Sequence, residues 1–343
     1  MSDQAEVLIS RAGGIGKIVL NRPKALNALT LDMCHAIEGQ MRAWAGDDSV
    51  RAVVVRGAGE KAFCAGGDIR RLADKSSDYP FRFWRDEYRL NGLIKHYPKP
   101  YVALVDGISM GGGVGVSAHG SHRVVSEYVM FAMPETGIGL FPDVGGSYVL
   151  SRMPGEIGIY LGLTGARLKA ADVMHAGYGT HYVTRDRMDA LEQALAAASD
   201  VDAVLAGFAT DAGPAPLADL QGAIDRLFAH DTVEAIFAAL QADGSPFATE
   251  TLETLKHKSP FSLKLTLRQI REGRALSFDD CMRMEWRMAS RIPETQDFYE
   301  GVRAVIIDKD HSPKWQPASL DGVTEAMIAR HFAPKPGDEL ELH

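Results

Sequence analysis

Short apolar runs alternate with amphipathic stretches along the first half of the chain. Apolar runs typical of buried strands occupy residues 16–20, 50–55, 101–105 and 123–126. Apolar positions three and four residues apart predict helices at 30–44 and 79–95, and Thr30 is placed to N-cap the first of them. This alternation of strand and helix favours an α/β fold, with a parallel sheet covered by helices.

The second half of the chain has a different character. Beyond about Met188 it becomes rich in alanine and leucine, and the apolar spacing predicts mainly helices. The expected helices lie at residues 189–208, 217–228, 232–242 and 260–272. Residues 210–216 combine Gly, Pro and Asp and are the best candidate for a linker.

Composition and charge narrow the class of protein. The chain has 343 residues, of which 46% are hydrophobic, with a net charge of -8. This charge argues against a general nucleic-acid binder, although Arg70, Arg71 and residues 256–258 could hold a small phosphorylated ligand. Three cysteines are too few for a disulfide framework and lack the spacing of a zinc site. With neither a signal peptide nor a membrane-spanning apolar run in the sequence, we expect a cytoplasmic protein with no membrane partner.

A glycine cluster at residues 107–115 follows the strand predicted at 101–105. Free N–H groups at a helix start after such a turn attract an anion, including a carbonyl oxygen that becomes negative during a reaction. Glu135 and Asp143 come next, each directly after a proline, among glycines and apolar side chains. An apolar lining raises the pKa of a carboxyl group, which suits it to proton transfer near neutral pH. Together these features suggest acyl chemistry.

Two glycine patterns in this stretch have other interpretations. Ser109 stands in a G-x-S-x-G pattern between a strand and a helix, as the nucleophile of an α/β-hydrolase would. No later histidine stands out as its partner, and a chain with 34 glycines produces such a pattern easily. Residues 113–118 match G-x-G-x-x-A, but the first glycine of a dinucleotide fingerprint should follow its strand directly. We therefore favour neither motif.

Cys64, His119 and His122 are further candidates for chemistry. Cys64 lies between Phe63 and Ala65, which is typical of a small buried apolar residue rather than an activated thiol. The two histidines lie three residues apart, but no third ligand of metal-site spacing accompanies them. We interpret all three as structural and expect no metal site.

In its glycine-rich segments and its N-terminal segment, the sequence resembles the crotonase (enoyl-CoA hydratase/isomerase) superfamily. Residues 65–69 and 110–115 look like the two halves of that superfamily's oxyanion hole, and residues 20–29 resemble its coenzyme A-binding start. Resemblance to the hydrolase branch rests on residues 63–70, 131–146 and 300–310.

The resemblance implies a fold and a set of site residues. The fold would be a crotonase-type spiral of ββα turns at 1–195, followed by a helical C-terminal region at 196–343 that covers the site. Backbone N–H groups of Gly67 and Gly112 would hold the thioester oxygen. Glu135 would be the principal catalytic carboxylate, Asp143 would orient water or substrate, and Glu87 would contact a hydroxyl of the acyl group. Further substrate-binding positions implied by the resemblance are Ala25, Ala65, Gly66, Asp68 and Ile69.

The resemblance also implies an activity. Hydratases of this superfamily carry a second glutamate two residues after the glycine triplet, where this chain has Gly115. We therefore expect hydrolysis of a short branched β-hydroxyacyl-CoA thioester, 3-hydroxyisobutyryl-CoA of valine breakdown, without metal or redox cofactor. Whether Glu135 attacks the carbonyl or activates water stays open, as does assembly into a homo-oligomer. The alternatives are an enoyl-CoA hydratase or isomerase, and a non-catalytic relative that binds RNA or protein.

Overall fold

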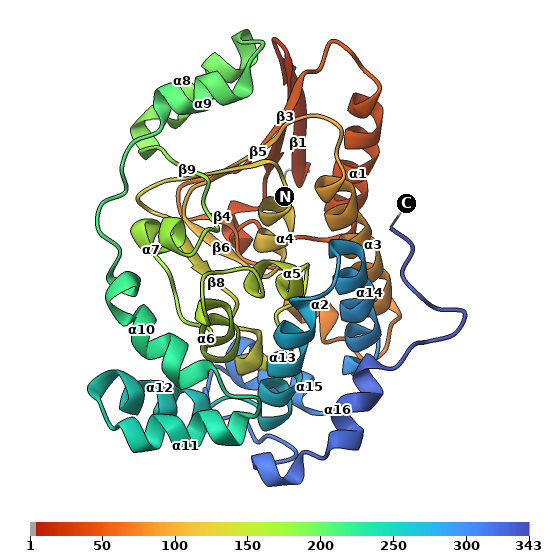
Figure 1. Cartoon of the computed structure of the whole chain (residues 1–343). Coiled ribbons are helices and arrows are strands. Elements are labelled where there is room, and N and C mark those ends of the chain that lie inside the picture. Colours follow the sequence, from red (N-terminus) through yellow and green to blue (C-terminus); the bar gives the residue numbers. More distant parts are fainter. Residues whose placement is uncertain (1–4, 343) are drawn as a thin grey trace.

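Two sheets form the centre of the molecule (Figure 1). The computed structural model describes residues 5–342. The strands are β1 (Val7–Ala12), β2 (Ile15–Leu20), β3 (Ala52–Gly57), β4 (Ala62–Cys64), β5 (Tyr101–Val105), β6 (Ile108–Met110), β7 (His122–Val125), β8 (Met130–Ala132) and β9 (His181–Tyr182). One sheet has six strands in the order β1-β2-β3-β5-β7-β9, and the other has three in the order β4-β6-β8. All pairs are parallel except β1 with β2.

The chain alternates between the two sheets. Each of β3, β5 and β7 in the large sheet is followed by a short strand of the small sheet, and then by helical structure. Repetition of this unit produces the spiral of ββα turns that the sequence predicts, so the expected fold class is confirmed. Because β4, β6 and β8 pair in parallel, the segments that follow their carboxyl ends meet at one edge.

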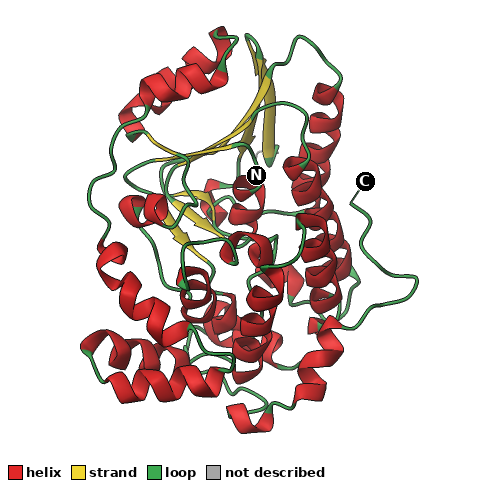
Figure 2. Cartoon of the chain, in the orientation of Figure 1, coloured by secondary structure: helices red, strands yellow, loops and turns green. Residues whose placement is uncertain are grey.

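Helices cover the sheets and form the lower half of the molecule (Figure 2). They are α1 (Leu31–Ala45), α2 (Ile69–Leu72), α3 (Tyr79–Lys95), α4 (Gly112–Ala118), α5 (Gly146–Leu150), α6 (Ile157–Thr164), α7 (Ala170–His175), α8 (Arg185–Ala197), α9 (Val201–Phe208), α10 (Pro216–Phe228), α11 (Val233–Asp243), α12 (Pro246–Lys256), α13 (Pro260–Gly273), α14 (Phe278–Ala289), α15 (Asp297–Val302) and α16 (Glu325–Phe332). Single-turn segments are η1 (Pro23–Ala25), η2 (Glu135–Ile138), η3 (Ile292–Glu294), η5 (Leu320–Gly322) and the π-helical η4 (Arg303–Ile307).

Successive side chains of a strand point to opposite faces, and the large sheet separates two hydrophobic cores accordingly. In β3, Val54 faces a smaller core closed by α8 and α9, while Val53 and Val55 face the main core. The main core continues through the helical region as far as Leu342. The division of the chain at residue 195 stays a prediction.

Several element boundaries differ from those expected. The helix predicted at 189–208 is two helices, because Asp200 accepts a hydrogen bond from the N–H of Ala203 and starts α9 as its N-cap. Strands β4, β6 and β8 were not predicted, since three residues are too few to show an alternating pattern. Helix α14 was also missed, although Ser277 and Asp280 form its N-terminal cap and supply a readable signal.

Candidate active site

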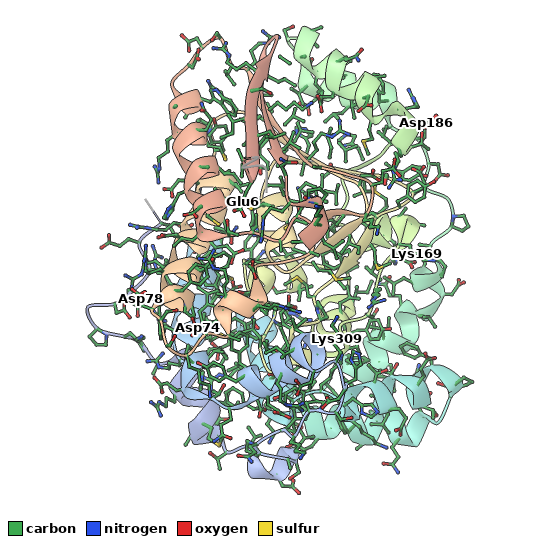
Figure 3. The ribbon with its side chains drawn as sticks, turned by 180° about the vertical axis from the view of Figure 1, so that it is seen from behind. Glu6, Asp74, Asp78, Lys169, Asp186 and Lys309 are labelled. Carbon is green, nitrogen blue, oxygen red and sulfur yellow. The ribbon has the colours of Figure 1, made fainter. Side chains whose placement is uncertain are left out.

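A cavity of about 450 Å³ lies between the glycine turns of the small sheet and the helical region. Helix α3 supplies part of its wall, and the loops after β8 supply another part. Residues of the second half of the chain close it: His257, Lys258, Val305, Ile306, His311 and Pro313. Segments α2 and η4 meet where Arg70 donates a hydrogen bond to the carbonyl oxygen of Ile306 (3.3 Å). Figure 3 shows Asp74 and Lys309, which follow these two segments, on the same face of the molecule.

Two glycine turns lie against each other at one side of the cavity. Gly66 and Gly111 have φ angles of 112° and 47°, which side chains rarely tolerate. A Cβ atom at Gly111 would lie 3.3 Å from the Cα atom of Gly66. Within residues 5–342, the N–H groups of Gly67 and Gly112 donate no hydrogen bond. They are therefore available to a ligand oxygen in the cavity that both turns line.

Backbone bonds hold this glycine cradle in place. The N–H of Leu29 donates to the carbonyl oxygen of Gly66 (2.8 Å), and the N–H of Asp68 donates to that of Leu29 (2.9 Å). These two bonds flank Gly67 and fix the orientation of its peptide groups. Gly112 opens α4, whose close approach to β4 leaves only 2.1 Å between a Cβ atom at Gly113 and the carbonyl oxygen of Cys64.

Glu135 begins η2 directly after Pro134, and its side chain is buried in the cavity wall. The helical region fixes the next residue: Thr136 donates to the carbonyl oxygen of Leu163 (3.0 Å) and accepts at its own carbonyl from Ser259 (3.1 Å). Atom Oε2 of Glu135 has no hydrogen-bond partner in the described chain. Burial, with a smaller contribution from Asp143, raises the pKa of Glu135 well above its usual value.

Asp143 lies in the next loop of the same wall, between Pro142 and a backbone reversal at Val144 and Gly145. The hydroxyl of Tyr88 donates to Oδ2 of Asp143 (3.0 Å). Burial raises the pKa of Asp143 to about 7, and the bond from Tyr88 opposes that rise. Asp143 is therefore a carboxyl group that titrates near neutral pH.

Glu87 and Lys258 complete the charged lining. Glu87 lies on α3, is 2% exposed, and has one oxygen without a partner among the described residues. Burial first, and then the charge of Asp143, raises its pKa well above the usual value. Lys258 precedes α13; burial lowers its pKa, and the charge of Glu135 opposes that shift. Its ammonium group therefore offsets part of the negative charge on this wall.

The structure brings most of the predicted site residues together on this cavity. They are Ala65, Gly66, Gly67, Ile69, Glu87, Gly112, Glu135 and Asp143. Two predicted residues lie outside the lining. Ala25 is exposed at the end of η1, and Asp68 forms an ion pair with Arg22 (3.0 Å). The sequence had marked residues 256–258 only as a basic spot, and Val305 and Ile306 carried no signal that would place them here.

The alternative motifs are explained by packing. Ser109 is fully buried with its hydroxyl 3.1 Å from that of Tyr178, so it is not the exposed nucleophile of an α/β-hydrolase. Cys64 is buried and its pKa is raised to about 12, which confirms its interpretation as a structural residue. His119 bonds the carbonyl oxygen of Val144 (2.7 Å). Across residues 5–342, no group of three or more His, Cys, Asp or Glu side chains is placed to hold a metal ion.

The neighbourhood of Gly115 bears on the choice of reaction. A Cβ atom at Gly115 would lie 2.8 Å from both the amide nitrogen of Asn91 and Cβ of Val144. Such distances are below those of real contacts, so a glutamate at this position would displace its neighbours. A larger side chain at position 115 therefore requires Asn91 and Val144 to move.

A spiral of two mostly parallel sheets, with glycine N–H groups that are unpaired among residues 5–342 and buried carboxyls on one cavity, is typical of the crotonase class. Comparison with known proteins agrees with this. The family model described as enoyl-CoA hydratase/isomerase matches residues 15–332. The chain belongs to this enoyl-CoA hydratase/isomerase family.

Relatives of known name cover nearly the whole chain. A mitochondrial 3-hydroxyisobutyryl-CoA hydrolase of Danio rerio is 48% identical, with 100% of this chain and 94% of its own length covered. The enzyme of the same name from Homo sapiens is 45% identical, with 98% and 91% covered. Among solved structures, a carnitinyl-CoA dehydratase from Mycobacterium thermoresistibile superposes with a TM-score of 0.95 at 45% identity, covering 99% of each chain. An enoyl-CoA hydratase from Rhodobacter sphaeroides gives 0.92 at 41%, covering 98% of this chain and 100% of its own.

The comparison corrects one prediction. We expected a cytoplasmic protein, and this is wrong: the similar hydrolases are named as mitochondrial. The residues that the structure describes include no helix with the length and apolar character needed to cross a bilayer.

Proposed function

We propose that this protein hydrolyses 3-hydroxyisobutyryl-CoA to 3-hydroxyisobutyrate and coenzyme A, a step of valine degradation. The observation that carries the proposal is the shared cavity, lined by three buried carboxyls and by two glycines whose N–H groups are unpaired within residues 5–342. The names of relatives at 45–48% identity support the same substrate.

The geometry supplies each part of a thioester hydrolysis. The N–H groups of Gly67 and Gly112 donate hydrogen bonds to the thioester carbonyl oxygen, which becomes negative when the carbonyl carbon is attacked. A carbon–oxygen bond forms, the carbon–sulfur bond breaks, and the leaving thiolate of coenzyme A takes up a proton. Glu135 has a raised pKa and an unpartnered Oε2 atom among the described residues, and it either takes a proton from the attacking water or attacks the carbonyl carbon itself. Asp143, oriented by Tyr88, holds the water or the substrate hydroxyl.

Glu87 is the remaining acid of the cavity and acts on the acyl group. Its Oε1 atom has no hydrogen-bond partner among the described residues and lies in the cavity lining, so it is placed to form a hydrogen bond with the β-hydroxyl of the substrate. A buried polar partner of this kind rejects an acyl chain that lacks the hydroxyl, because the partner would then stay unpaired. No metal or redox cofactor enters this scheme.

Hydration or dehydration is the second candidate. The two solved structures described above are named as a dehydratase and a hydratase, which favours it. Addition of water to a double bond uses a pair of acids in this superfamily, and the second position is Gly115. Since Asn91 and Val144 fill the space around it, hydrolysis is the better supported reaction.

Thiol release from a panel of short acyl-CoAs tests the proposed function. We expect the largest kcat/KM for a branched β-hydroxyacyl-CoA, and a lower value for the same chain without the hydroxyl. Incubation with crotonyl-CoA, followed through the absorbance of its conjugated thioester, is expected to show no change. Loss of that absorbance without thiol release would instead establish a hydratase.

Replacement of Tyr88 by Phe is expected to change the pH dependence of the reaction. The phenol bond lowers the pKa of Asp143, so its removal raises that pKa above about 7. If ionised Asp143 is the active form, kcat/KM falls several-fold below about pH 7 and approaches the wild-type value in alkaline buffer. A pH profile of kcat/KM measures this shift; an acidic limb that moves to lower pH would contradict the assigned role of Asp143.

A further inference from the structure

Besides the three buried acids of the cavity, another buried carboxyl group, that of Glu285, contacts the turn that carries Asp143. Glu285, on α14, is 0% exposed and does not line the cavity. Its Oε2 atom accepts a hydrogen bond from the N–H of Gly145 (2.7 Å). Its Oε1 atom accepts from the N–H of Ser147 (2.8 Å) and from the hydroxyl of the same residue (2.5 Å). Both carboxylate oxygens are therefore used to hold the backbone directly after Asp143.

Helix α13 holds the other end of the same turn. Atom Nε2 of Gln269, also fully buried, donates to the carbonyl oxygen of Pro142 (2.5 Å) and to the hydroxyl of Ser147 (2.8 Å). Glu285 and Gln269 thus bind the turn 142–147 on both sides of Asp143, and they come from two adjacent helices of the second half of the chain (Figure 1).

The turn needs such support because its backbone is unfavourable. Val144 is β-branched and has a φ angle of 52°, in the left-handed region where such residues are outliers. Gly145 follows at 85°. His119, the C-cap residue of α4, is a third anchor of the turn. Its Nε2 atom lies 2.7 Å from the carbonyl oxygen of Val144. A strained conformation persists only where its surroundings determine it, and here they do so around a single cavity-lining acid.

The geometry of the anchor suits a carboxylate. Burial raises the pKa of Glu285 to about 8, and the hydrogen bonds from Ser147 and Gly145 oppose that rise. Three donors converge on Glu285, two N–H groups and one hydroxyl, and a carboxylate has two acceptor oxygens to receive them. A glutamine would present one oxygen and turn an NH₂ group toward a donor. Burying a carboxylate is costly, so its presence in the core is explained by what it holds.

We propose that Glu285 is a positioning residue for Asp143: it fixes the turn 142–147 so that the Asp143 carboxyl meets the reacting groups in the cavity. This inference rests on the proposed hydrolysis, in which Asp143 orients water or the substrate hydroxyl. It makes the helices α13 and α14 a part of the active-site framework rather than only a cover.

Kinetics of Glu285→Gln test the inference. We expect kcat to fall by roughly 10- to 100-fold, since misplacing a catalytic group by ~1 Å costs up to about 10²-fold. KM should change less than about twofold, because the cavity lining keeps its composition. Glu285→Asp retains two acceptor oxygens and should recover part of the lost kcat. Glu156→Gln is the matched control: this glutamate pairs with Arg271 and Arg274 outside the cavity, and kcat should not change.

Amide hydrogen exchange provides a readout that does not depend on activity. The N–H groups of Gly145 and Ser147 should exchange faster in Glu285→Gln than in the wild type, while the rest of α14 keeps its protection. If Glu285→Gln does not fold, Gln269→Met removes the two bonds from α13 and should lower kcat with the same pattern. Wild-type kcat in the folded variant would overturn the inference, whatever the exchange rates of Gly145 and Ser147. A wild-type protein that releases no thiol from any acyl-CoA would instead overturn the proposed function.

Discussion

Glu135→Gln is expected to lower kcat for thiol release by about 10²- to 10⁴-fold, the usual contribution of a positioned acid or base. Glutamine keeps the shape of the side chain but accepts no proton from water. Since the cavity wall is otherwise unchanged, KM should stay within a few-fold of the wild-type value. Steady-state thiol release measures both constants. Glu253→Gln, on the exposed face of α12, is the control and should behave as the wild type.

The same substitution has an expected effect on stability that shows whether the loss of activity is chemical. The pKa of Glu135 is raised in the folded protein, so the folded state binds its proton more tightly than the unfolded chain does. The corresponding stability is fully present below the unfolded pKa and is lost as pH rises through the folded value. Glutamine carries no such penalty, so near pH 8 the Tm of Glu135→Gln should equal or exceed that of the wild type. A lower Tm there would indicate damage to the fold.

Isotope labelling separates the two possible roles of Glu135. In a single turnover in ¹⁸O-labelled water, direct attack by Glu135 on the thioester forms an acyl-enzyme, whose hydrolysis can leave the label in the Glu135 carboxylate. Activation of water by Glu135 places the label only in the product acid. Mass spectrometry of the peptide that contains Glu135 distinguishes these outcomes.

The residues that the sequence could predict share one property: their role is encoded within a few neighbouring positions. Gly67, Gly112 and Glu135 stand in short glycine- and proline-containing segments that identify their turns. The continuous apolar run of β3 likewise reveals a strand with two buried faces. Such local signals gave the α/β class, and the family resemblance carried by the same segments gave the spiral and most of the cavity-lining residues.

What the sequence could not predict depends on contacts between distant segments. Lys258 reaches the cavity only because the turn before α13 packs beside η2, more than a hundred residues earlier in the chain. Glu285 looks like any charged residue of an amphipathic helix, and only the folded structure shows it buried against the Asp143 turn. Asp68 shows the converse case: the resemblance implies a binding role, which stays a prediction, and the fold pairs the side chain with Arg22.

Gly112→Ala is expected to lower kcat/KM by about 10²- to 10³-fold, the usual cost of losing one oxyanion-hole donor. The added Cβ atom would lie 2.6 Å from Oε1 of Glu87 and 3.2 Å from the carbonyl carbon of Gly66. The second of these contacts is backbone, so the turn itself must shift and carry the Gly112 N–H away from the thioester oxygen.

Most of this loss should fall in kcat, because the negative oxygen forms only during the reaction and the donor binds it more tightly than the ground-state carbonyl. Gly222→Ala is the matched control, since a Cβ atom at this helical position of α10 meets no atom within 4 Å. It should leave kcat unchanged and raise stability by about 0.4–1 kcal/mol, as an alanine does in a compatible helix position. A folded Gly112→Ala protein with wild-type kcat/KM would show that this amide does not bind the reacting oxygen, and a different donor would then have to stabilise the charge.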